Sequence, residues 1–278
     1  VKRGTLLLTF YEYSADKWLR TVPTVTTITA GDQWVQGGGY HLVSDPQVTR
    51  VTVVLATDDP DGVLADDVEL KTVNPTPSPG PAVVLENQGG RLTLDADGSV
   101  RSLRDKATDA ELLAATGAPF FAAVASNWRL PVTRLERQGQ SLKLVFGENQ
   151  AQATVAVQEL PYALVFRVQS WSPADLTSLT LAELTVKKRK TTAGSLGATY
   201  DEKTAVGLQA LHYAGQQRAQ AMNDTMHFAC VFPGQRGLDK AAAALFVCPR
   251  ARLEKTIEEI ELACGLPSPH LEGVWGKL

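Results

Sequence analysis

Residues 90–103 read GRLTLDADGSVRSL, a run that alternates apolar and polar side chains on both sides of a turn. Side chains of a β-strand point alternately to opposite faces, so Leu92 and Leu94 share one face of a first strand. Asp97 and Gly98 form a turn dipeptide of the kind that joins two antiparallel strands. The segment therefore predicts a β-hairpin whose second strand covers 99–103.

Similar strand-like segments continue along the chain on the C-terminal side of this hairpin. Several are too apolar to be exposed on either face, which is typical of strands inside a sandwich. They predict a large antiparallel β-sandwich of two sheets over residues 83–265. The expected strands are 83–87, 91–94, 99–103, 142–146, 152–158, 163–170, 179–186, 204–212, 226–232 and 242–247.

The N-terminal residues also predict short strands separated by turn residues, an arrangement typical of a jelly roll. In the first of them Leu6, Leu8 and Phe10 share one face and Tyr11 and Tyr13 share the other. We expect the apolar face to contact the core. The predicted strands are 5–13, 24–29, 33–43, 48–57 and 62–73, so the whole chain is predicted to be all-β.

A proline-rich stretch over 74–81 divides the sequence, because proline lacks a backbone donor and disrupts a regular strand ladder. We expect a first domain over 1–73, a linker over 74–82, a second domain over 83–265 and an exit linker over 266–278. Residues 1–73 carry 6 basic and 10 acidic side chains, and the remainder carries 21 and 20. The chain begins at Val1 without an initiator methionine, so we expect it to be a processed or excised piece.

One segment near the C-terminus has the periodicity of a helix. Leu253, Ile257, Ile260 and Cys264 recur at three- and four-residue spacing, with glutamates mostly on the other side. Gly265 suits the end of such a helix, because glycine tolerates a left-handed cap. The sequence thus predicts one amphipathic C-terminal helix.

Composition excludes several classes of protein. Of 278 residues, 44% are hydrophobic and 21% are charged, as in ordinary globular proteins. The formal net charge is -3 without a basic block, so we expect no nucleic-acid partner. No apolar run reaches the length of about 18 residues that a bilayer requires, so we expect no membrane association.

Part of the first domain resembles carbohydrate-binding jelly rolls of the galactose-binding-like type. The resemblance lies in WVQ at 34–36, VTRVTVVL at 48–55 and LADDVEL at 64–70, and in the aromatic-acidic hairpin FYEYSAD at 10–16. It covers about the C-terminal half of such a domain, which makes the predicted fold a partial jelly-roll β-sandwich. The resemblance implies that the chain binds a polysaccharide or an oligosaccharide.

The second domain resembles the β-sandwich that precedes a (β/α)8 catalytic barrel in several glycoside hydrolase families. The residues that carry this resemblance are GRLTLDADGSVRSLRDKAT at 90–108. It implies an accessory, non-catalytic region of a secreted polysaccharide-degrading enzyme, extracellular or periplasmic, whose partner is a catalytic barrel beyond residue 278. Similar hairpins occur in the sandwich domains of polysaccharide lyases and mannosidases, so the type of parent enzyme stays open.

Aromatic side chains are the candidates for sugar binding, because an aromatic ring packs against the apolar face of a pyranose. They are Tyr11, Tyr13, Trp18 and Tyr40. Two alternatives are that Tyr11 and Tyr13 serve in packing and that Trp18 and Trp34 fill the core.

Carboxylates near the end of the first domain are candidates for a structural calcium ion, which the resemblance also implies. Asp67 and Glu69 share one side of the strand predicted over 62–73 and supply hard oxygen ligands. The alternative is a solvated acidic surface. No other cofactor is indicated.

Two further functions remain open at this point. A lyase needs a tyrosine or histidine to transfer a proton, and His212, Tyr213 and His227 are the candidates. The other alternative is an adhesion or structural module. Of the three cysteines, Cys230 and Cys248 lie in strand-like runs and can pair only if those strands are neighbours.

Overall fold

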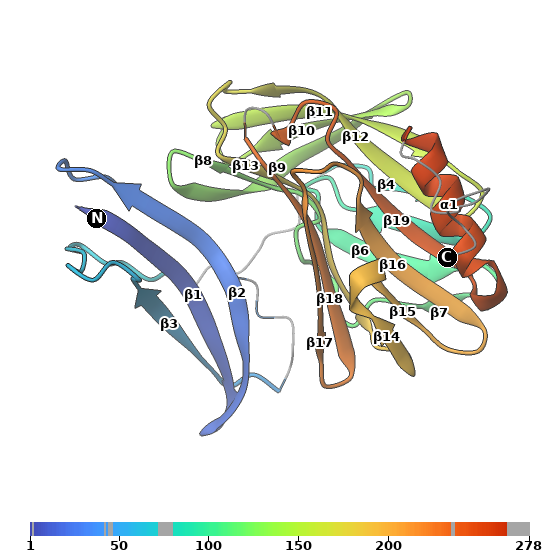
Figure 1. Ribbon diagram of the computed structural model, residues 1–278, viewed down its shortest axis with the longest axis horizontal. Helices are drawn as coiled ribbons and strands as arrows, with labels where there is room; N and C mark the ends of the chain where they lie inside the picture. Colours follow the sequence, from blue (N-terminus) through green and yellow to red (C-terminus); the bar gives the residue numbers. More distant parts are fainter. Residues whose placement is uncertain (2, 42, 44–46, 72–79, 235–236, 266–278) are drawn as a thin grey trace, which may run out of the picture.

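The computed structural model describes residues 1, 3–41, 43, 47–71, 80–234 and 237–265 (Figure 1). Within them the chain is mostly strand and forms three antiparallel sheets followed by one α-helix. The all-β prediction with large antiparallel sheets and a single C-terminal helix is confirmed. Most of the linker predicted over 74–82 and the exit segment over 266–278 lie outside the described residues.

The first sheet has three strands in the order β2-β1-β3, namely β1 (Gly4–Ser14), β2 (Lys17–Ala30) and β3 (Arg50–Ala56). Leu6, Leu8 and Phe10 are buried on one face, as their alternation predicts. The strands predicted over 33–43 and 62–73 are wrong for the described residues of those segments, which contain isolated bridges instead of strands.

The hairpin predicted over 90–103 belongs to a four-stranded sheet. Its strands, in order, are β4 (Val83–Glu86), β5 (Gly90–Leu94), β6 (Val100–Asp105) and β7 (Ala110–Glu111). In the turn, the Asp97 carboxylate accepts hydrogen bonds from the backbone N–H and the hydroxyl of Ser99 at 3.0 and 2.6 Å. Gly98 has a φ of +74°, which glycine adopts without strain.

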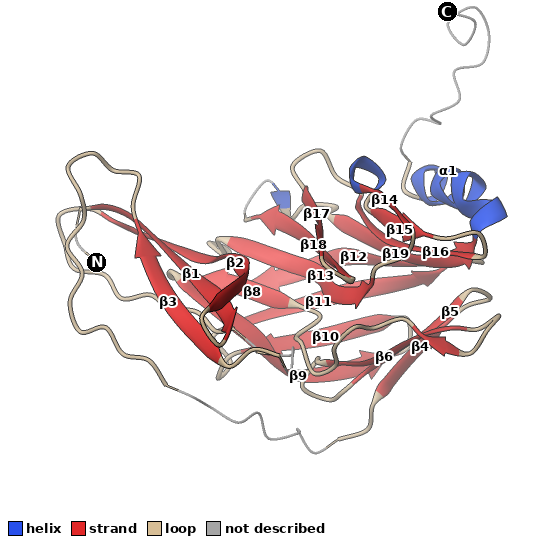
Figure 2. Cartoon of the chain, turned by 90° about the horizontal axis from the view of Figure 1, so that it is seen from below, coloured by secondary structure: helices blue, strands red, loops and turns tan. Residues whose placement is uncertain are grey.

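The third sheet contains twelve of the described strands and curves over the four-stranded sheet (Figure 2). Its order is β14-β15-β16-β19-β12-β11-β10-β9-β8-β13-β18-β17. The strands are β8 (Ala122–Ala125), β9 (Trp128–Gln138), β10 (Ser141–Phe146), β11 (Ala151–Glu159), β12 (Ala163–Ser172), β13 (Ser178–Lys187), β14 (Thr191–Ala193), β15 (Ala198–Tyr200), β16 (Thr204–Ala210), β17 (Gln216–Met222), β18 (Thr225–Pro233) and β19 (Ala242–Pro249).

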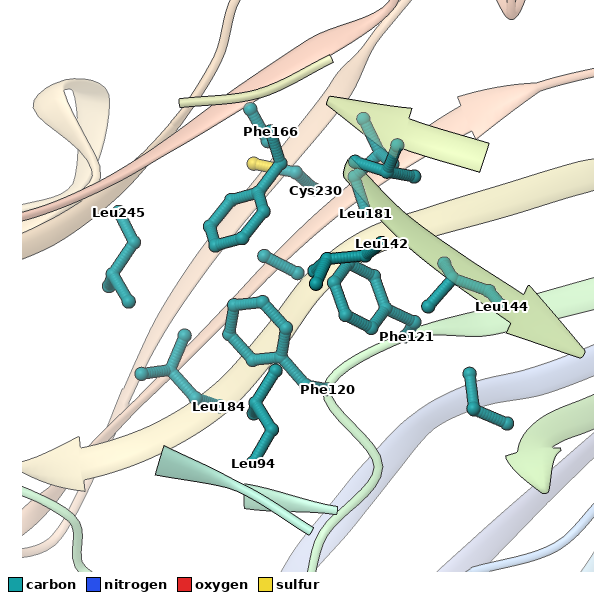
Figure 3. Packing of buried hydrophobic residues seen from close by; sticks show 14 of the residues in the cluster. Leu94, Phe120, Phe121, Leu142, Leu144, Phe166, Leu181, Leu184, Cys230 and Leu245 are labelled. Carbon is teal, nitrogen blue, oxygen red and sulfur yellow. The ribbon is translucent and has the colours of Figure 1, made fainter. Parts of the chain in front are cut away.

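The main core lies between the twelve-stranded and four-stranded sheets. Phe120, Phe121 and Phe166 meet there edge to face, with ring centroids 4.8 to 5.9 Å apart, and leucines from both sheets surround them (Figure 3). Such aromatic pairs favour offset or edge-on contact because of the ring quadrupole. The core explains why so many strand positions are apolar.

A second, smaller core explains the strands that are apolar on both faces. Helix α1 (Leu253–Ala263) follows a short 3-10 turn and buries Leu253, Ile257 and Ile260. These side chains pack with Phe246 and Ala244 on the face of β19 opposite to the main core. The predicted helix is confirmed, and Gly265 beyond it has a φ of +72°.

All three cysteines are free thiols. Cys230 lies on β18 and Cys248 on β19, and these strands are not neighbours in the sheet. The condition for pairing them is therefore not met. Burial raises the pKa of the Cys248 thiol to about 11, so it is protonated at neutral pH.

Candidate functional site

Three of the four predicted sugar-binding aromatics share one face of the three-stranded sheet. Tyr13 lies opposite Trp18 in the register of β1 and β2, and Tyr11 is two residues earlier on β1. Directly opposed and alternate residues lie on the same face. We call Tyr11, Tyr13 and Trp18 the aromatic face. It is the face opposite to Leu6, Leu8 and Phe10.

Charged and polar side chains accompany the aromatic face. Arg50 lies opposite Tyr13 on β3, and its guanidinium carbon is 4.2 Å from the Tyr13 ring centroid. An Arg50 Nη1 is 3.6 Å from an Asp16 carboxylate oxygen. Trp18 is 55% exposed, while Tyr11 and Tyr13 are half-buried. The face thus offers ring surfaces for stacking beside donors and acceptors for hydroxyl groups.

The core-filling alternative for the tryptophans is wrong. Trp18 is 55% exposed and Trp34 is 54% exposed. The core of this sheet is made instead by aliphatic residues and Phe10. Both indoles are therefore accessible for contact with a ligand or a partner.

Tyr40 lies apart from the aromatic face, in the segment 34–41. This segment packs between the apolar face of the three-stranded sheet and the turn from β8 to β9. Gly38 pairs with Trp128, and a Cβ on Gly39 would lie 2.5 Å from Val25. The three glycines at 37–39 are thus enclosed by neighbouring side chains and by the backbone of the turn from β8 to β9.

The end of the 34–41 segment is held by a contact between His41 and a buried carboxyl group. His41 Nε2 is 2.7 Å from Glu12 Oε1, and the Glu12 side chain is fully buried on the inner face of β1. The His41 ring also stacks on Phe10 with centroids 5.3 Å apart. Glu12 was not among the sequence candidates. It lies between Tyr11 and Tyr13, and a charged residue next to this half-exposed face is not expected to be buried.

Beside Tyr40 lies a group of partly buried polar side chains, which we call the polar cluster: Tyr40, Arg129, Glu183 and His227. Arg129 on β9 forms an ion pair with Glu183 on β13, and its guanidinium carbon is 5.6 Å from the Tyr40 ring centroid. His227 Nε2 on β18 is 3.7 Å from Glu183 Oε1. Three strands and the 34–41 segment therefore bring these side chains together.

Burial and charge together set the ionisation of the polar cluster. Burial alone raises the pKa of Glu183, but the charges of Arg129, His227 and Arg218 outweigh it and lower that pKa. Burial likewise disfavours the charged form of Arg129, yet Glu183 and Tyr40 hold its pKa above the usual value. Burial raises the pKa of Tyr40. At neutral pH the cluster thus holds a charged pair beside a protonated phenol.

The Tyr40 hydroxyl oxygen is buried and has no hydrogen-bond partner among the described residues. On the other side of the cluster, the Thr185 hydroxyl oxygen is 3.2 Å from His227 Nδ1. A buried hydroxyl without a partner is costly, by about 1–3 kcal/mol, unless another group satisfies it. Arg129 lies close enough to act on the Tyr40 hydroxyl, without the geometry of a full hydrogen bond.

The predicted calcium ligands do not fit a calcium site. Asp67 and Glu69 are exposed, and the described part of 62–73 contains no strand that would align them. Glu69 forms an ion pair with Lys71 at 3.0 Å. Within the described ranges, no three carboxylate, histidine or cysteine side chains gather in a way that could hold a metal ion. Six to eight oxygen ligands are not assembled here.

The residues considered for a lyase are not brought together. His212 and Tyr213 follow β16, where their rings are 4.4 Å apart and Tyr213 is 88% exposed. His227 lies opposite Gln220, close to the turn that joins β17 to β18. His212 and Tyr213 lie before Gln216, at the opposite end of this hairpin. Of the three, His227 alone belongs to the polar cluster.

No family model and no curated protein matches this chain. In the described part of the chain, no helix has the length and apolar character needed to cross a membrane.

Sequence reasoning missed Arg129 and Glu183. Glu183 is flanked on both sides by apolar or uncharged residues in the run LTLAELTV at 179–186, and Arg129 is followed by LPVT at 130–133. An isolated charge in such a run is the one signal that was present, because charged residues are rarely buried unless paired. Their pairing depends on the contact between β8 and β13, which the sequence does not reveal.

Proposed function

We propose that this chain is the non-catalytic, carbohydrate-binding accessory region of a secreted, multidomain polysaccharide-degrading glycoside hydrolase. The observation that carries the proposal is the aromatic face, where Trp18 stands exposed opposite Tyr13. A pyranose ring stacks on such side chains through its C–H groups, while its hydroxyls bond to neighbouring polar atoms. The partner in the same parent enzyme is a catalytic barrel that follows this region.

The physical advantage of such a region is local concentration. A binding face linked to a catalytic domain turns each later encounter with the polymer into an intramolecular event. The large sandwich supports the barrel in this proposal and does not break bonds itself. The polar cluster, with Glu183 as its sole carboxylate, does not have the two carboxylates that glycoside hydrolysis ordinarily uses.

The test is a binding panel with the intact chain and two matched variants. Affinity electrophoresis in gels that contain plant and algal polysaccharides gives a retardation for each polymer. We expect at least one polymer to retard the chain, and Trp18→Ala to weaken that binding about tenfold, equivalent to about 1.4 kcal/mol. Tyr213→Ala removes another exposed aromatic, outside the aromatic face, and is expected to bind normally.

Two results would contradict the proposal. One is equal retardation of Trp18→Ala and the unmodified chain on every polymer that binds. The other is the absence of any retardation, combined with retention of protein partners, which would favour an adhesion or structural module.

A polysaccharide lyase is the second candidate, favoured by one observation. The polar cluster places a protonated tyrosine and a histidine beside an arginine, and a lyase needs a proton-transfer residue of this kind near a cation. Incubation of the chain with acidic polysaccharides decides the question, because lyases release unsaturated products that absorb ultraviolet light. Formation of unsaturated products would show that the chain is itself catalytic and would contradict the accessory function.

A further inference from the structure

The strands β13, β18 and β17 present a row of polar side chains on their outer face. Glu183 is opposite Ala229, and Ala229 is opposite Arg218, so these three residues form one row across the strands. Ala229 is buried, and its methyl group is the smallest side chain of the row. Glu183 and Arg218 therefore flank a short side chain at the centre.

A second row lies beside the first. Thr185 is opposite His227, and His227 is opposite Gln220. Residues two apart on one strand share a face, so both rows point the same way. The residues between them, Leu184 and Phe228, point into the main core. The two rows thus form one polar patch at the end of the twelve-stranded sheet, and Arg129 and Tyr40 adjoin it at Glu183.

Arginine cations outnumber carboxylates in the two rows and the residues that adjoin them. Arg129 and Arg218 carry positive charge, whereas Glu183 is the carboxylate of these rows. Glu183 is already paired with Arg129. Lys187 and Asp224, nearer the hairpin turn, add one charge of each sign. A chain with a formal net charge of -3 thus carries a locally positive surface here.

Arg218 acts on Glu183 through its charge but does not lie within ion-pair distance of it. Among the described residues it forms no ion pair, and its Nη2 is 3.4 Å from the Gln216 side-chain oxygen. The guanidinium group presents parallel N–H donors that match a carboxylate or a sulfate in bidentate geometry. Because Arg129 is already paired with Glu183, we expect an anionic ligand to bind to Arg218.

We propose that this patch binds an anionic substituent of a sugar, the carboxylate of a uronic acid or a sulfate ester, with Arg218 as the principal ligand and His227 and Gln220 beside it. The inference rests on the proposed carbohydrate-binding function and adds the class of sugar. It also assigns a second contact point, separate from the aromatic face, so that a polymer is held at two places.

The experiment measures binding of three oligosaccharides to the intact chain by calorimetry: an oligogalacturonate, a sulfated galactan oligomer and a neutral galactan oligomer. We expect at least one acidic oligomer to bind tenfold or more tightly than the neutral one at low salt, and less tightly as salt rises. The acidic oligomer that binds better identifies the carboxylate or the sulfate.

Variants assign the effect to the patch. Arg218→Gln and His227→Gln are each expected to weaken acidic binding about tenfold and to leave neutral binding unchanged. Lys255→Gln removes an exposed cation on α1 and is expected to change neither. Circular dichroism melting curves establish that the variants fold.

Failure of this inference is distinguishable from failure of the proposed function. Neutral and acidic oligomers that bind equally, with Arg218→Gln unchanged, overturn the anion site alone. Loss of acidic binding in Trp18→Ala but not in Arg218→Gln also overturns it. If none of the oligomers binds, both proposals fall.

Discussion

Gly38 and Trp128 pair through their backbones and join the 34–41 segment to the twelve-stranded sheet, almost 90 residues later in the chain. The Gly38 N–H donates to the Asn127 carbonyl at 3.1 Å, and the Gly38 carbonyl accepts from the Arg129 N–H at 2.9 Å. The Trp128 indole covers Gly38, where a Cβ would lie 2.7 Å from a ring carbon. The contact fixes the 34–41 segment, and with it Tyr40, against the large sandwich.

Substitution of a glycine in this segment is expected to destabilise the protein. A Cβ on Gly37 would lie 2.7 Å from the Asn127 carbonyl oxygen, which belongs to the backbone and cannot move alone. We expect Gly37→Ala to lower the free energy of unfolding by about 1–3 kcal/mol in urea titrations. Gly194→Ala is the control, because a Cβ there meets nothing within 4 Å. Equal stability of the two variants would contradict the packing described here.

These contacts also show where prediction from sequence stops. The hairpin at 90–103 was predictable because its turn residues and alternation act locally. The helix after Pro249 was predictable for the same reason. The 34–41 segment was not, because its glycines are explained by β8–β9, almost 90 residues later in the chain.

The candidate sites divide in the same way. Alternation along β1 placed Tyr11 and Tyr13 on one face, since that pattern lies within one strand. The grouping of Tyr40 with Arg129, Glu183 and His227 depends on strand order in a twelve-stranded sheet. Asp67 and Glu69 were wrongly aligned, because the described part of 62–73 forms no strand although its composition resembles one.

The Arg129–Glu183 pair is expected to stabilise the contact between β9 and β13. The Arg129 side chain is 15% exposed and the Glu183 side chain is 24% exposed. Removal of one partner therefore leaves the other charge unpaired and partly buried. We expect Glu183→Gln to lower the free energy of unfolding by about 2 kcal/mol, below the range for fully buried pairs. A double-mutant cycle with Arg129→Gln measures the coupling. A coupling energy near zero would show that the pair contributes nothing.

Acid sensitivity is expected from Asp201. Its carboxylate accepts hydrogen bonds from the backbone N–H groups of Lys203 and Thr204 at 2.8 and 2.9 Å, and from Arg189 at 2.7 Å. Partial burial alone would raise the pKa of Asp201, but these donors outweigh it and lower that pKa. The folded state therefore binds the proton less tightly than the unfolded state, whose pKa is about 3.9.

The sign of the pH dependence follows from this difference. The stabilising contribution of Asp201 is complete above the unfolded pKa and is lost as pH falls through the lower folded pKa. We expect Asp201→Asn to cost about 1 kcal/mol at neutral pH and progressively less as the pH falls below about 4. Asp175→Asn, at an exposed site, is the control. A cost for Asp201→Asn that is unchanged at acid pH would contradict this assignment.

The C-terminal helix is expected to be part of the folded unit through its apolar side. Ile260 is fully buried against β19, whereas Leu262 is 54% exposed. We expect Ile260→Ala to lower the free energy of unfolding by about 2–5 kcal/mol and Leu262→Ala to change it little. Thermal or urea unfolding measures both. Similar small effects would mean that the helix does not contribute to the core.

The most direct measurement is an NMR titration that follows the indole N–H signals of the tryptophans while a retarding polysaccharide fragment is added. If glycan binds at the aromatic face, the Trp18 signal shifts and saturates with the affinity measured for the whole chain, and the Trp171 signal on β12 stays in place. A Trp18 signal that does not move while the fragment binds would contradict the account.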